Sequence, residues 1–423
     1  MSRELIRRDA KHSWHPYTQH GAEAEPLAVA SAHGARLVLH DGTELIDAIS
    51  SWWAILHGHG EARLVVAATE QMQRLDHVLF AGTTHEPAVR LAERLCEKTP
   101  GDLTRAFFSD DGSTAVEVAL KMVLQRWAQT EEPQRRVFVT LKGSYHGDTF
   151  GAMSVGDPDP FFLPFQKLLF ESRPVHATPG SVAAALADLG QRAAGVLVEP
   201  LLQGAAGMLT HPEQWLRETR AACDAAGVPL IADEVMTGFG RTGALFACER
   251  AGVAPDVLCL AKGLTGGTFP LSVTLATEEI FQSFVSADRR RAFFHGHTFT
   301  ANPVGCAIAL ASLDLCEERD VPAQLSAIGE SIHKRLVPLA SDPRVLKLRH
   351  LGGMVAMDLD PGEGSEGGYM ASLAPRIRKF AIEQGVLLRP LGNVVYALPP
   401  ACTTESECER IAAAMAGCLD LVS

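Results

Sequence analysis

The stretch from Val228 to Gly243 reads Val-Pro-Leu-Ile-Ala-Asp-Glu-Val-Met-Thr-Gly-Phe-Gly-Arg-Thr-Gly, an apolar run followed by two acidic residues and a glycine-rich turn. The apolar run predicts a buried strand that ends at Asp233. Open α/β sheets bind ligands at the carboxyl ends of their strands, so Asp233 is a candidate ligand-binding carboxylate. A buried carboxylate is costly without a cationic partner, which a bound ligand would supply.

Short apolar runs of the same kind recur on both sides of this stretch and alternate with helix-like segments. The runs lie at 105–108, 136–141, 194–199 and 256–261, and the strongest helical pattern is at 112–127. Strands of four to six apolar residues with helices between them are typical of a parallel sheet covered on both faces. The sequence therefore predicts an α/β fold.

The two ends of the chain have a different pattern. Asp41-Gly42 lies between two short apolar runs and predicts a hairpin turn. Strands at 386–389 and 394–398 are expected to be joined through Gly392-Asn393. The capping box Thr404-x-x-Glu407 predicts the start of a final helix.

This change of pattern marks the domain boundaries. We predict a large domain over residues 57–305, with a mainly parallel sheet between helices. We predict a small α+β domain made from both chain ends, residues 1–56 and 306–423. A Gly/Glu-rich stretch at 361–368 predicts a loop in the small domain.

The composition limits the classes of partner. The chain has 423 residues with 38 Lys and Arg against 50 Asp and Glu, a formal net charge of −12. Nucleic acids and anionic membranes attract a positive field, so we expect neither partner. No run approaches the roughly 20 apolar residues of a membrane span, and the charged N-terminus does not resemble a signal peptide. Nine scattered cysteines without a Cys-x-x-Cys pair favour reduced thiols, so we expect a cytoplasmic protein.

Two further motifs suggest other chemistries. The run from Gly238 to Gly243 matches the G-x-G-x-x-G pattern of nicotinamide dehydrogenases. Asp233 and Glu234, however, lie where a pyrophosphate would bind, and no clear helix with an acidic residue about 20 positions on follows. His57-x-His59 and His295-x-His297 resemble metal ligands, but neither pair is completed by a carboxylate or cysteine. We expect a turn-rich loop and no bound metal.

Another set of residues fits pyridoxal phosphate. That cofactor needs a lysine for its aldehyde, a carboxylate for its ring nitrogen, a flat group against the ring and donors for its phosphate. Lys262 and Asp233 each follow an apolar strand, and Tyr145 follows a third. Gly112 and Ser113 begin a strong helix, where free N–H groups and the helix dipole favour a phosphate. Each residue alone has an ordinary structural explanation, but together they predict a pyridoxal-phosphate site.

In this order the motifs resemble those of the class III aminotransferases, which have fold type I of the pyridoxal-phosphate enzymes. The resemblance covers nearly the whole chain and rests on these segments: Gly112-Ser113, Tyr145-His146-Gly147, Glu199-Pro200, Asp233 to Gly243, Lys262-Gly263, and Thr298 within His295-Gly-His-Thr-Phe. It implies that Lys262 binds the cofactor covalently, that Asp233 pairs with the ring nitrogen and that Tyr145 stacks on the ring.

The same resemblance implies how the phosphate is held. Gly112 and Ser113 are expected to bind the phosphate in their own subunit. The residue equivalent to Thr298 reaches the phosphate of the neighbouring subunit in this family. The resemblance therefore implies a homodimer with its active sites at the subunit interface.

The segments expected to face the substrate are the most distinctive. Trp14-His-Pro-Tyr17-Thr, Ser51-Trp52-Trp53 and Leu388-Arg389-Pro390 resemble those of members that transfer an amino group from S-adenosylmethionine to 8-amino-7-oxononanoate, giving 7,8-diaminononanoate for biotin synthesis. Tryptophans near a chain start can be core residues, but aromatic walls suit a long aliphatic substrate. The resemblance implies that Arg389 pairs with a substrate carboxylate. The other expected substrate-binding residues are Tyr17, Trp52, Trp53, Tyr145 and Lys262.

Two other functions stay open at this point. An ω-aminotransferase for another donor or acceptor, such as lysine, a diamine, ornithine or a γ-amino acid, shares the cofactor residues but lacks the paired tryptophans Trp52 and Trp53. A ligand-binding protein on the same fold has no need of Lys262 and Asp233. The amino donor stays open between adenosylmethionine and lysine.

Overall fold

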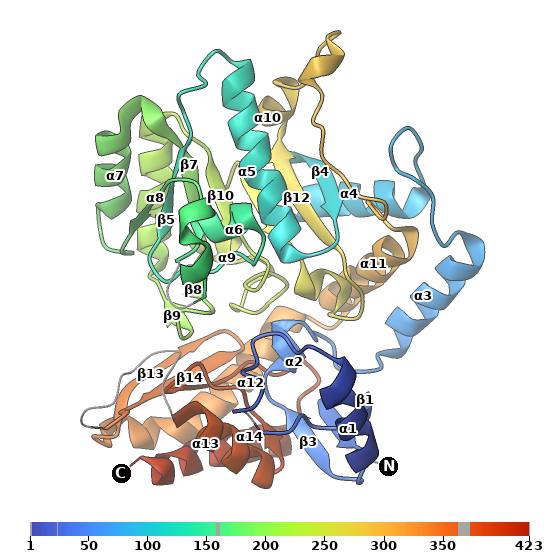
Figure 1. Cartoon of the computed structure of the whole chain (residues 1–423), viewed down its shortest axis with the longest axis vertical. Helices are drawn as coiled ribbons and strands as arrows, with labels where there is room; N and C mark the ends of the chain where they lie inside the picture. Colours follow the sequence, from blue (N-terminus) through green and yellow to red (C-terminus); the bar gives the residue numbers. More distant parts are fainter. Residues whose placement is uncertain (1, 23, 158–160, 363–372, 423) are drawn as a thin grey trace. The chain divides into compact units, whose positions relative to one another are not determined.

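The computed structural model describes residues 2–22, 24–157, 161–362 and 373–422. The chain forms two compact units, a large one of residues 62–326 and a small one of residues 1–61 and 327–423 (Figure 1). Within the described ranges no helix is long and apolar enough to cross a membrane. None of the nine cysteines forms a disulfide within the described residues.

A seven-stranded sheet forms the centre of the large unit. Its strand order is β4-β12-β11-β10-β7-β5-β6. Only β12 runs antiparallel to its neighbours β11 and β4, and the other pairs are parallel. The prediction of a mainly parallel sheet is confirmed. The strands are β4 Leu103–Ser109, β5 Val137–Leu141, β6 Ser172–Val175, β7 Ala193–Val198, β10 Leu230–Asp233, β11 Val257–Leu260 and β12 Ser272–Thr277.

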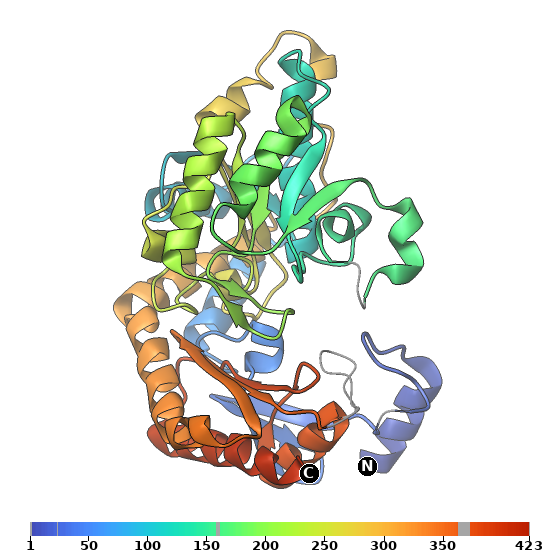
Figure 2. The same ribbon diagram turned by 90° about the vertical axis from the view of Figure 1, so that its left-hand side faces the viewer.

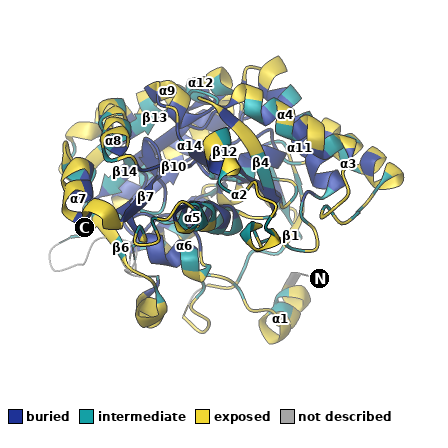
Figure 3. Ribbon diagram, turned by 90° about the horizontal axis from the view of Figure 1, so that it is seen from above, coloured by how far each residue is buried: buried dark blue, intermediate teal, exposed yellow. Residues whose placement is uncertain are grey.

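Helices cover the two faces of this sheet. The helix α5 lies in front of the sheet in Figure 1, whereas α8 and α11 lie behind it, as Figure 3 shows from above. Every residue of β5, β7, β10 and β11 is buried, because both faces of these strands are covered. The helices are α3 Ala62–Arg74, α4 Glu86–Lys98, α5 Gly112–Gln129, α6 Phe150–Val155, α7 Ser181–Leu189, α8 Glu213–Ala226, α9 Ala247–Ala251, α10 Glu278–Gln282 and α11 Pro303–Glu318, and a short hairpin joins β8 Leu202–Gln203 to β9 Leu209–Thr210.

The boundaries of the units differ from those expected at residues 57 and 305. The helix α11 was expected in the small domain, but it belongs to the large unit, where it packs on α3 and α4. Leu64 of α3 forms a buried cluster with Val304, Ile308 and Leu315 of α11. The sequence change after residue 302 marks the start of a helix and not a domain boundary.

The small unit holds a mixed sheet and an antiparallel sheet, together with helices. Figure 2 shows the blue strands of the N-terminal segment beside the orange and red elements of the C-terminal segment. One sheet has the order β1-β2-β3-β15 and the other β13-β14-β16, and only β15 pairs in parallel, with β3. The elements are β1 Val29–His33, β2 Arg36–Leu39, β3 Glu44–Asp47, β13 Val345–Leu351, β14 Met354–Leu359, β15 Val386–Leu387, β16 Val394–Ala397, α1 Ser2–His12, α2 Ser50–Trp53, α13 Leu373–Glu383 and α14 Glu405–Gly417, with α12 Val321–Leu336 beginning in the large unit.

Local signals in the small unit are largely confirmed. The turn at Asp41-Gly42 joins β2 to β3, with Gly42 at φ +90° and the Asp41 carboxylate accepting from the Thr43 N–H at 2.9 Å. The capping box begins α14 as predicted. The strands β15 and β16 were expected to be directly joined, but they lie in different sheets. The loop expected at 361–368 lies largely outside the described residues.

A stability prediction follows from the packing of α12 on the turn between β13 and β14. A Cβ on Gly329 would overlap the carbonyl oxygen of Gly352 and lie 2.9 Å from Nε2 of His350. We expect Gly329→Ala to destabilise the protein by about 1–3 kcal/mol, because the backbone at Gly352 or the helix α12 must shift to make room for the methyl group. Helix propensity alone predicts the opposite sign, about 1 kcal/mol of stabilisation.

Urea denaturation measures this difference. The control is Glu330→Ala, at the exposed neighbouring position of the same helix, which should change stability by less than about 0.5 kcal/mol. A Gly329→Ala protein as stable as the control contradicts the predicted overlap.

Candidate active site

The carboxylate of Asp233 lies at the carboxyl end of β10, where the sequence predicts it. The side chain is buried. Its Oδ2 lies 2.7 Å from Nδ1 of His146, and its Oδ1 accepts from the N–H of Val235 at 3.0 Å. These contacts hold the carboxylate in one orientation at the edge of the sheet.

A second buried carboxyl group lies near this pair. Glu199 follows β7, the neighbour of β10, and accepts from the N–H groups of Tyr145 at 3.1 Å and Gly204 at 3.0 Å. Burial raises the pKa of Glu199 to about 7, and the charge of Asp233 adds to this rise, while His146 opposes it. Glu199 is therefore poised between its neutral and charged forms near neutral pH.

His146 connects the two carboxyl groups electrostatically. Burial alone disfavours its charged form, but the hydrogen bond and charge of Asp233, together with the charge of Glu199, raise its pKa above the usual value. Within the described residues, the buried Nε2 of His146 has no hydrogen-bond partner. Neither His146 nor Glu199 is distinguished by the sequence beyond its place in a family motif, although both follow buried strands at the same sheet edge as Asp233.

Lys262 lies at this edge after β11, which pairs with β10. It begins the short helix η3 Lys262–Thr265 with φ +45°, outside the usual range for a side-chain-bearing residue. Burial lowers the pKa of its amine, against the opposing charges of Asp233 and Glu199. A lysine with a lowered pKa is a better nucleophile and base at neutral pH.

The start of α5 forms a tight cradle with two neighbouring loops. Asp111 caps the helix by accepting from the Thr114 N–H. A Cβ on Gly112 would lie 2.7 Å from the Val235 side chain, and one on Gly147 would overlap Ser113. Only glycine leaves this space open beside the N–H groups of an 18-residue helix, an arrangement that fits a phosphate.

Tyr145 lies between the strand edge and two phenylalanines. It is half-buried, and its ring centroid lies 6.1 Å from that of Phe161 and 6.2 Å from that of Phe162. Its N–H is bonded to Glu199, which orients the backbone after β5. The structure thus brings Tyr145 to the same sheet edge as Asp233 and Lys262.

Thr298 occupies an exposed loop before α11. In this loop Thr300 donates to the carbonyl of His297 at 2.9 Å, and His295 Nδ1 lies 2.9 Å from Lys121 Nζ on α5. The loop is therefore tied to the helix that carries Ser113, while Thr298 itself is exposed. The part of the chain that the structure describes holds no group of three or more residues suited to a metal ion.

Four of the expected substrate residues, Tyr17, Trp52, Trp53 and Arg389, lie in the small unit, whereas Tyr145 and Lys262 lie in the large one. The guanidinium carbon of Arg389 lies 4.3 Å from the ring centroid of Trp52, and Tyr17 meets Trp52 edge-on at 5.6 Å. Trp52 is 39% exposed, whereas Trp53 is 6% exposed and donates from Nε1 to the hydroxyl of Tyr396 at 2.8 Å. The structure brings Tyr17, Trp52 and Arg389 together and packs Trp53 behind them.

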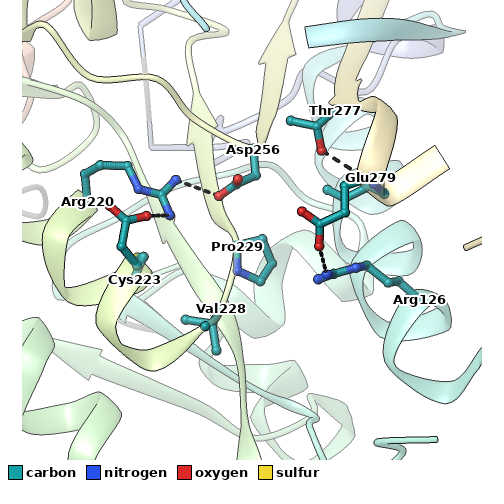
Figure 4. Close-up of a pocket in the computed structure, with 11 residues that line it drawn as sticks. Arg126, Arg220, Cys223, Val228, Pro229, Asp256, Thr277 and Glu279 are labelled. Atoms are coloured by element: carbon teal, nitrogen blue, oxygen red, sulfur yellow. Dashed lines mark hydrogen bonds and ion pairs between the residues drawn. The ribbon is translucent and has the colours of Figure 1, made fainter. Parts of the chain in front are cut away.

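A separate pocket of about 260 Å³ lies at the opposite ends of the strands (Figure 4). Val228 and Pro229 line it before β10, and Asp256 lines it before β11. Arg220 binds Asp256 at 2.6 Å across its wall. None of the predicted site residues lines this pocket, so it is distinct from the Asp233 and Lys262 edge.

Comparison with known proteins decides which family combines these features. The family Aminotransferase class-III matches residues 17–419. The chain belongs to the class III aminotransferases. It therefore has fold type I and is a pyridoxal-phosphate-dependent aminotransferase. The Gly238 to Gly243 run accordingly belongs to this family's motif and not to a dinucleotide fingerprint.

Several relatives of this class III enzyme cover it almost completely. A protein from Synechococcus elongatus named adenosylmethionine-8-amino-7-oxononanoate aminotransferase is 51% identical over 97% of this chain and 98% of its own. A protein of the same name from Mycobacterium leprae is 39% identical over 98% and 96%.

Solved structures agree with the family. The enzyme of that name from Methanocaldococcus jannaschii superposes with a TM-score of 0.94 at 34% identity over 99% of both chains. An amine transaminase from an uncultivated Pseudomonas species, in a pyridoxal-phosphate-bound form, superposes with 0.91 at 31% identity over 97% of this chain and 99% of its own.

The raised pKa of Glu199 predicts a pH-dependent contribution to stability. The carboxyl loses its proton near the usual 4.5 when unfolded but near 7 when folded. The folded protein thus binds the extra proton between these values, so the contribution is full below pH 4.5 and is lost as the pH rises through 7. The unfolding free energy should therefore fall between pH 5 and 8, and we expect this fall to be smaller in Glu199→Gln than in the wild type by on the order of 1–3 kcal/mol.

Urea denaturation of the cofactor-free protein at several pH values measures this effect. Glu97→Gln, at an exposed position of α4, is the control and should leave the pH profile parallel to that of the wild type. A Glu199→Gln profile that is also parallel contradicts the raised pKa.

Proposed function

We propose that this enzyme transfers an amino group from S-adenosylmethionine to 8-amino-7-oxononanoate, giving 7,8-diaminononanoate for biotin synthesis. The observation that carries the proposal is the 51% identity, over nearly the full length, to a relative named for that reaction. The cluster of Tyr17, Trp52 and Arg389 supports it, because it combines a cation with an apolar wall. Both substrates are small molecules.

The residues at the sheet edge fit the cofactor that the family uses. In this proposal Lys262 binds it covalently, Asp233 pairs with its ring nitrogen and Tyr145 lies against the ring. Gly112 and Ser113 hold the phosphate at the start of α5, where glycine leaves space for it. Pyridoxal phosphate, when bound, supplies an electron sink for the bonds broken at the amino-bearing carbon.

Asp233 and its neighbours determine the electrostatic environment of the cofactor ring in this proposal. With the cofactor bound, the Asp233 carboxylate would face the ring nitrogen and favour its protonated form, and His146 fixes the orientation of the carboxylate through the 2.7 Å contact. Burial makes this charge–charge interaction stronger than it is in water. Glu199, whose pKa is about 7, adds a negative charge near Asp233 and His146 when it loses its proton.

Lys262 moves the proton during the transfer. Burial lowers the pKa of its Nζ amine, which favours the neutral form that can accept a proton. It takes the proton from the amino-bearing carbon of the donor and delivers a proton on the other side of the transfer. The second substrate reverses these steps in the same place, which gives a ping-pong cycle.

Recognition of the long keto acid falls to the small unit. The carboxylate of a nine-carbon substrate lies far from its ketone, so it needs a cation at a distance and an apolar surface between. Arg389 presents a planar fork for that carboxylate. Trp52 lies against the guanidinium and supplies the apolar surface.

The assembly and location belong to the same proposal. The exposed position of Thr298 suits a residue that reaches the phosphate site of a second subunit, so we propose a homodimer with shared active sites. The free and mostly buried cysteines suit a reducing compartment, and we propose that the enzyme acts in the cytoplasm.

A related ω-aminotransferase activity is the second candidate. The superposition on an amine transaminase with a TM-score of 0.91 favours it, because the same fold serves a different amine there. Single half-reactions with S-adenosylmethionine, lysine, simple diamines and the keto acid, followed by stopped-flow absorbance, separate the candidates. Reaction with S-adenosylmethionine and the keto acid supports the biotin role. Absence of a reaction with the keto acid overturns it.

The covalent role of Lys262 gives a direct prediction. Borohydride treatment of the cofactor-loaded wild type should fix the cofactor on Lys262, as peptide mass analysis can detect. Lys262→Ala should fold, retain cofactor without a covalent bond and lose turnover by at least about a thousandfold, comparable to losing about 4 kcal/mol of barrier reduction. Lys142→Ala, at an exposed lysine, is the control. Label on another lysine refutes the assignment.

The role of Arg389 gives a second prediction. Lysine keeps the charge but loses the planar bidentate pairing. Arg389→Lys should therefore raise the apparent KM for 8-amino-7-oxononanoate about tenfold, worth about 1.4 kcal/mol. The half-reaction with isopropylamine should change less. Arg376→Lys, at an exposed position of α13, should change neither value. An unchanged KM in Arg389→Lys removes Arg389 from the site.

A further inference from the structure

The segment that carries the paired tryptophans has an unusual backbone. Ser50, Ser51 and Trp53 have φ values of +52°, +59° and +63°, although none is a glycine. Ser51 has ψ −79°, and Trp52 between these residues has φ −136° and ψ 63°. Side-chain-bearing residues adopt such conformations only where surrounding contacts impose them, and such strain gathers at functional sites. A specific interaction must therefore hold this segment.

The carboxylate of Asp47 supplies that interaction. Asp47 ends β3, three positions before Ser50, and is fully buried. Its two oxygens accept from the N–H of Ser51 at 2.8 and 2.7 Å, and Oδ2 also accepts from the Ser51 hydroxyl at 3.0 Å. Nε2 of His59 lies 2.9 Å from the same Oδ2 and holds the carboxylate from the other side. One buried group thus binds the most strained residue by three contacts.

Further contacts anchor the residues on either side of Ser51. The hydroxyl of Ser50 donates to the carbonyl of Leu398 at 2.7 Å, and the indole of Trp53 donates to Tyr396 at 2.8 Å. Trp52 is the residue left facing outward, where it meets Arg389 and Tyr17. The position of Trp52 therefore depends on the backbone angles at Ser51, and these depend on Asp47.

We propose that Asp47 is a positioning residue that sets substrate selectivity by locking the Ser50 to Trp53 turn, which holds Trp52 against Arg389. This proposal rests on the proposed function of that cluster. Asp47 itself is fully buried, and its carboxylate contacts Ser51 and His59. Loosening the turn lets Ser51 relax to an ordinary negative φ, which displaces Trp52 and frees the guanidinium of Arg389.

The first test replaces Asp47 with asparagine, which has nearly the same volume but turns one acceptor into an NH₂ donor facing other donors. We expect Asp47→Asn to raise the apparent KM for 8-amino-7-oxononanoate at least tenfold. The half-reaction rate with isopropylamine should change by less than about threefold, because that small amine does not need the cluster. An unchanged KM, or an equal loss with both substrates, overturns the proposal.

The matched control is Asp41→Asn in the same hairpin. Asp41 also accepts from a nearby backbone N–H, that of Thr43 at 2.9 Å, but it is exposed. Both half-reactions should stay within about twofold of the wild type. A KM change in Asp41→Asn as large as that in Asp47→Asn shows that a carboxylate anywhere in this hairpin matters, which contradicts a specific lock.

A rescue variant tests the backbone mechanism. Glycine adopts positive φ without strain, so Ser51→Gly in the Asp47→Asn background should recover part of the native turn. We expect the apparent KM of the double variant for 8-amino-7-oxononanoate to be at least threefold lower than that of Asp47→Asn. A double variant no better than Asp47→Asn shows that Asp47 does not act through the Ser51 angles. If Asp47→Asn does not fold, Ser51→Ala, which loses only the hydroxyl contact, should raise the KM two- to fivefold, and an unchanged KM there also overturns the proposal.

Hydrogen exchange supplies a readout that needs no substrate. In Asp47→Asn, peptides spanning residues 48–56 should exchange at least tenfold faster, while the strands of the large sheet keep their protection. Unchanged exchange in 48–56 overturns the lock. If the wild type does not react with the keto acid but exchange in 48–56 still rises, the proposed function fails and the lock on the turn stands. The two failures are thereby distinguishable.

Discussion

The buried carboxylate of Asp233 is the constraint on which the large unit depends. It lies at the end of the central strand β10, where its charge has left water and must be compensated. His146 meets one oxygen at 2.7 Å and a backbone N–H meets the other. These partners engage both oxygens and hold the carboxylate in one orientation at the edge of the sheet.

The strand order of the large sheet places two further candidate site residues beside Asp233. Because β10 lies between β7 and β11, the residues that follow these strands, Glu199 and Lys262, arrive at the same edge. Burial raises the pKa of the Glu199 carboxyl and lowers the pKa of the Lys262 amine, so it disfavours the charged form of each group. Both shifts favour neutral groups, which exchange protons more readily near neutral pH.

The two units divide the work by chemistry. The groups proposed to handle protons and a phosphate belong to the large unit, at strand ends and at the start of a long helix. The cation and the aromatic surface belong to the small unit, on a strained turn held by the buried carboxylate of Asp47. In each unit one buried carboxylate, Asp233 or Asp47, contacts neighbouring polar groups and thereby stabilises the backbone that follows its strand.

The sequence by itself determined the features that depend on neighbouring residues along the chain. Apolar runs marked the buried strands, Asp41-Gly42 marked a hairpin, and motif residues such as Asp233 and Lys262 were expected at strand ends. These signals are local, because turn preference, capping and strand burial act over a few residues.

Only the tertiary structure decided which distant segments meet. It placed α11 in the large unit and separated β15 from β16, because both outcomes depend on which apolar faces cover each other. It also brought His146 to Asp233, buried Trp53 on Tyr396 and joined Asp47 to Ser51. Such contacts depend on the relative positions of folded elements, and no spacing along the chain encodes them.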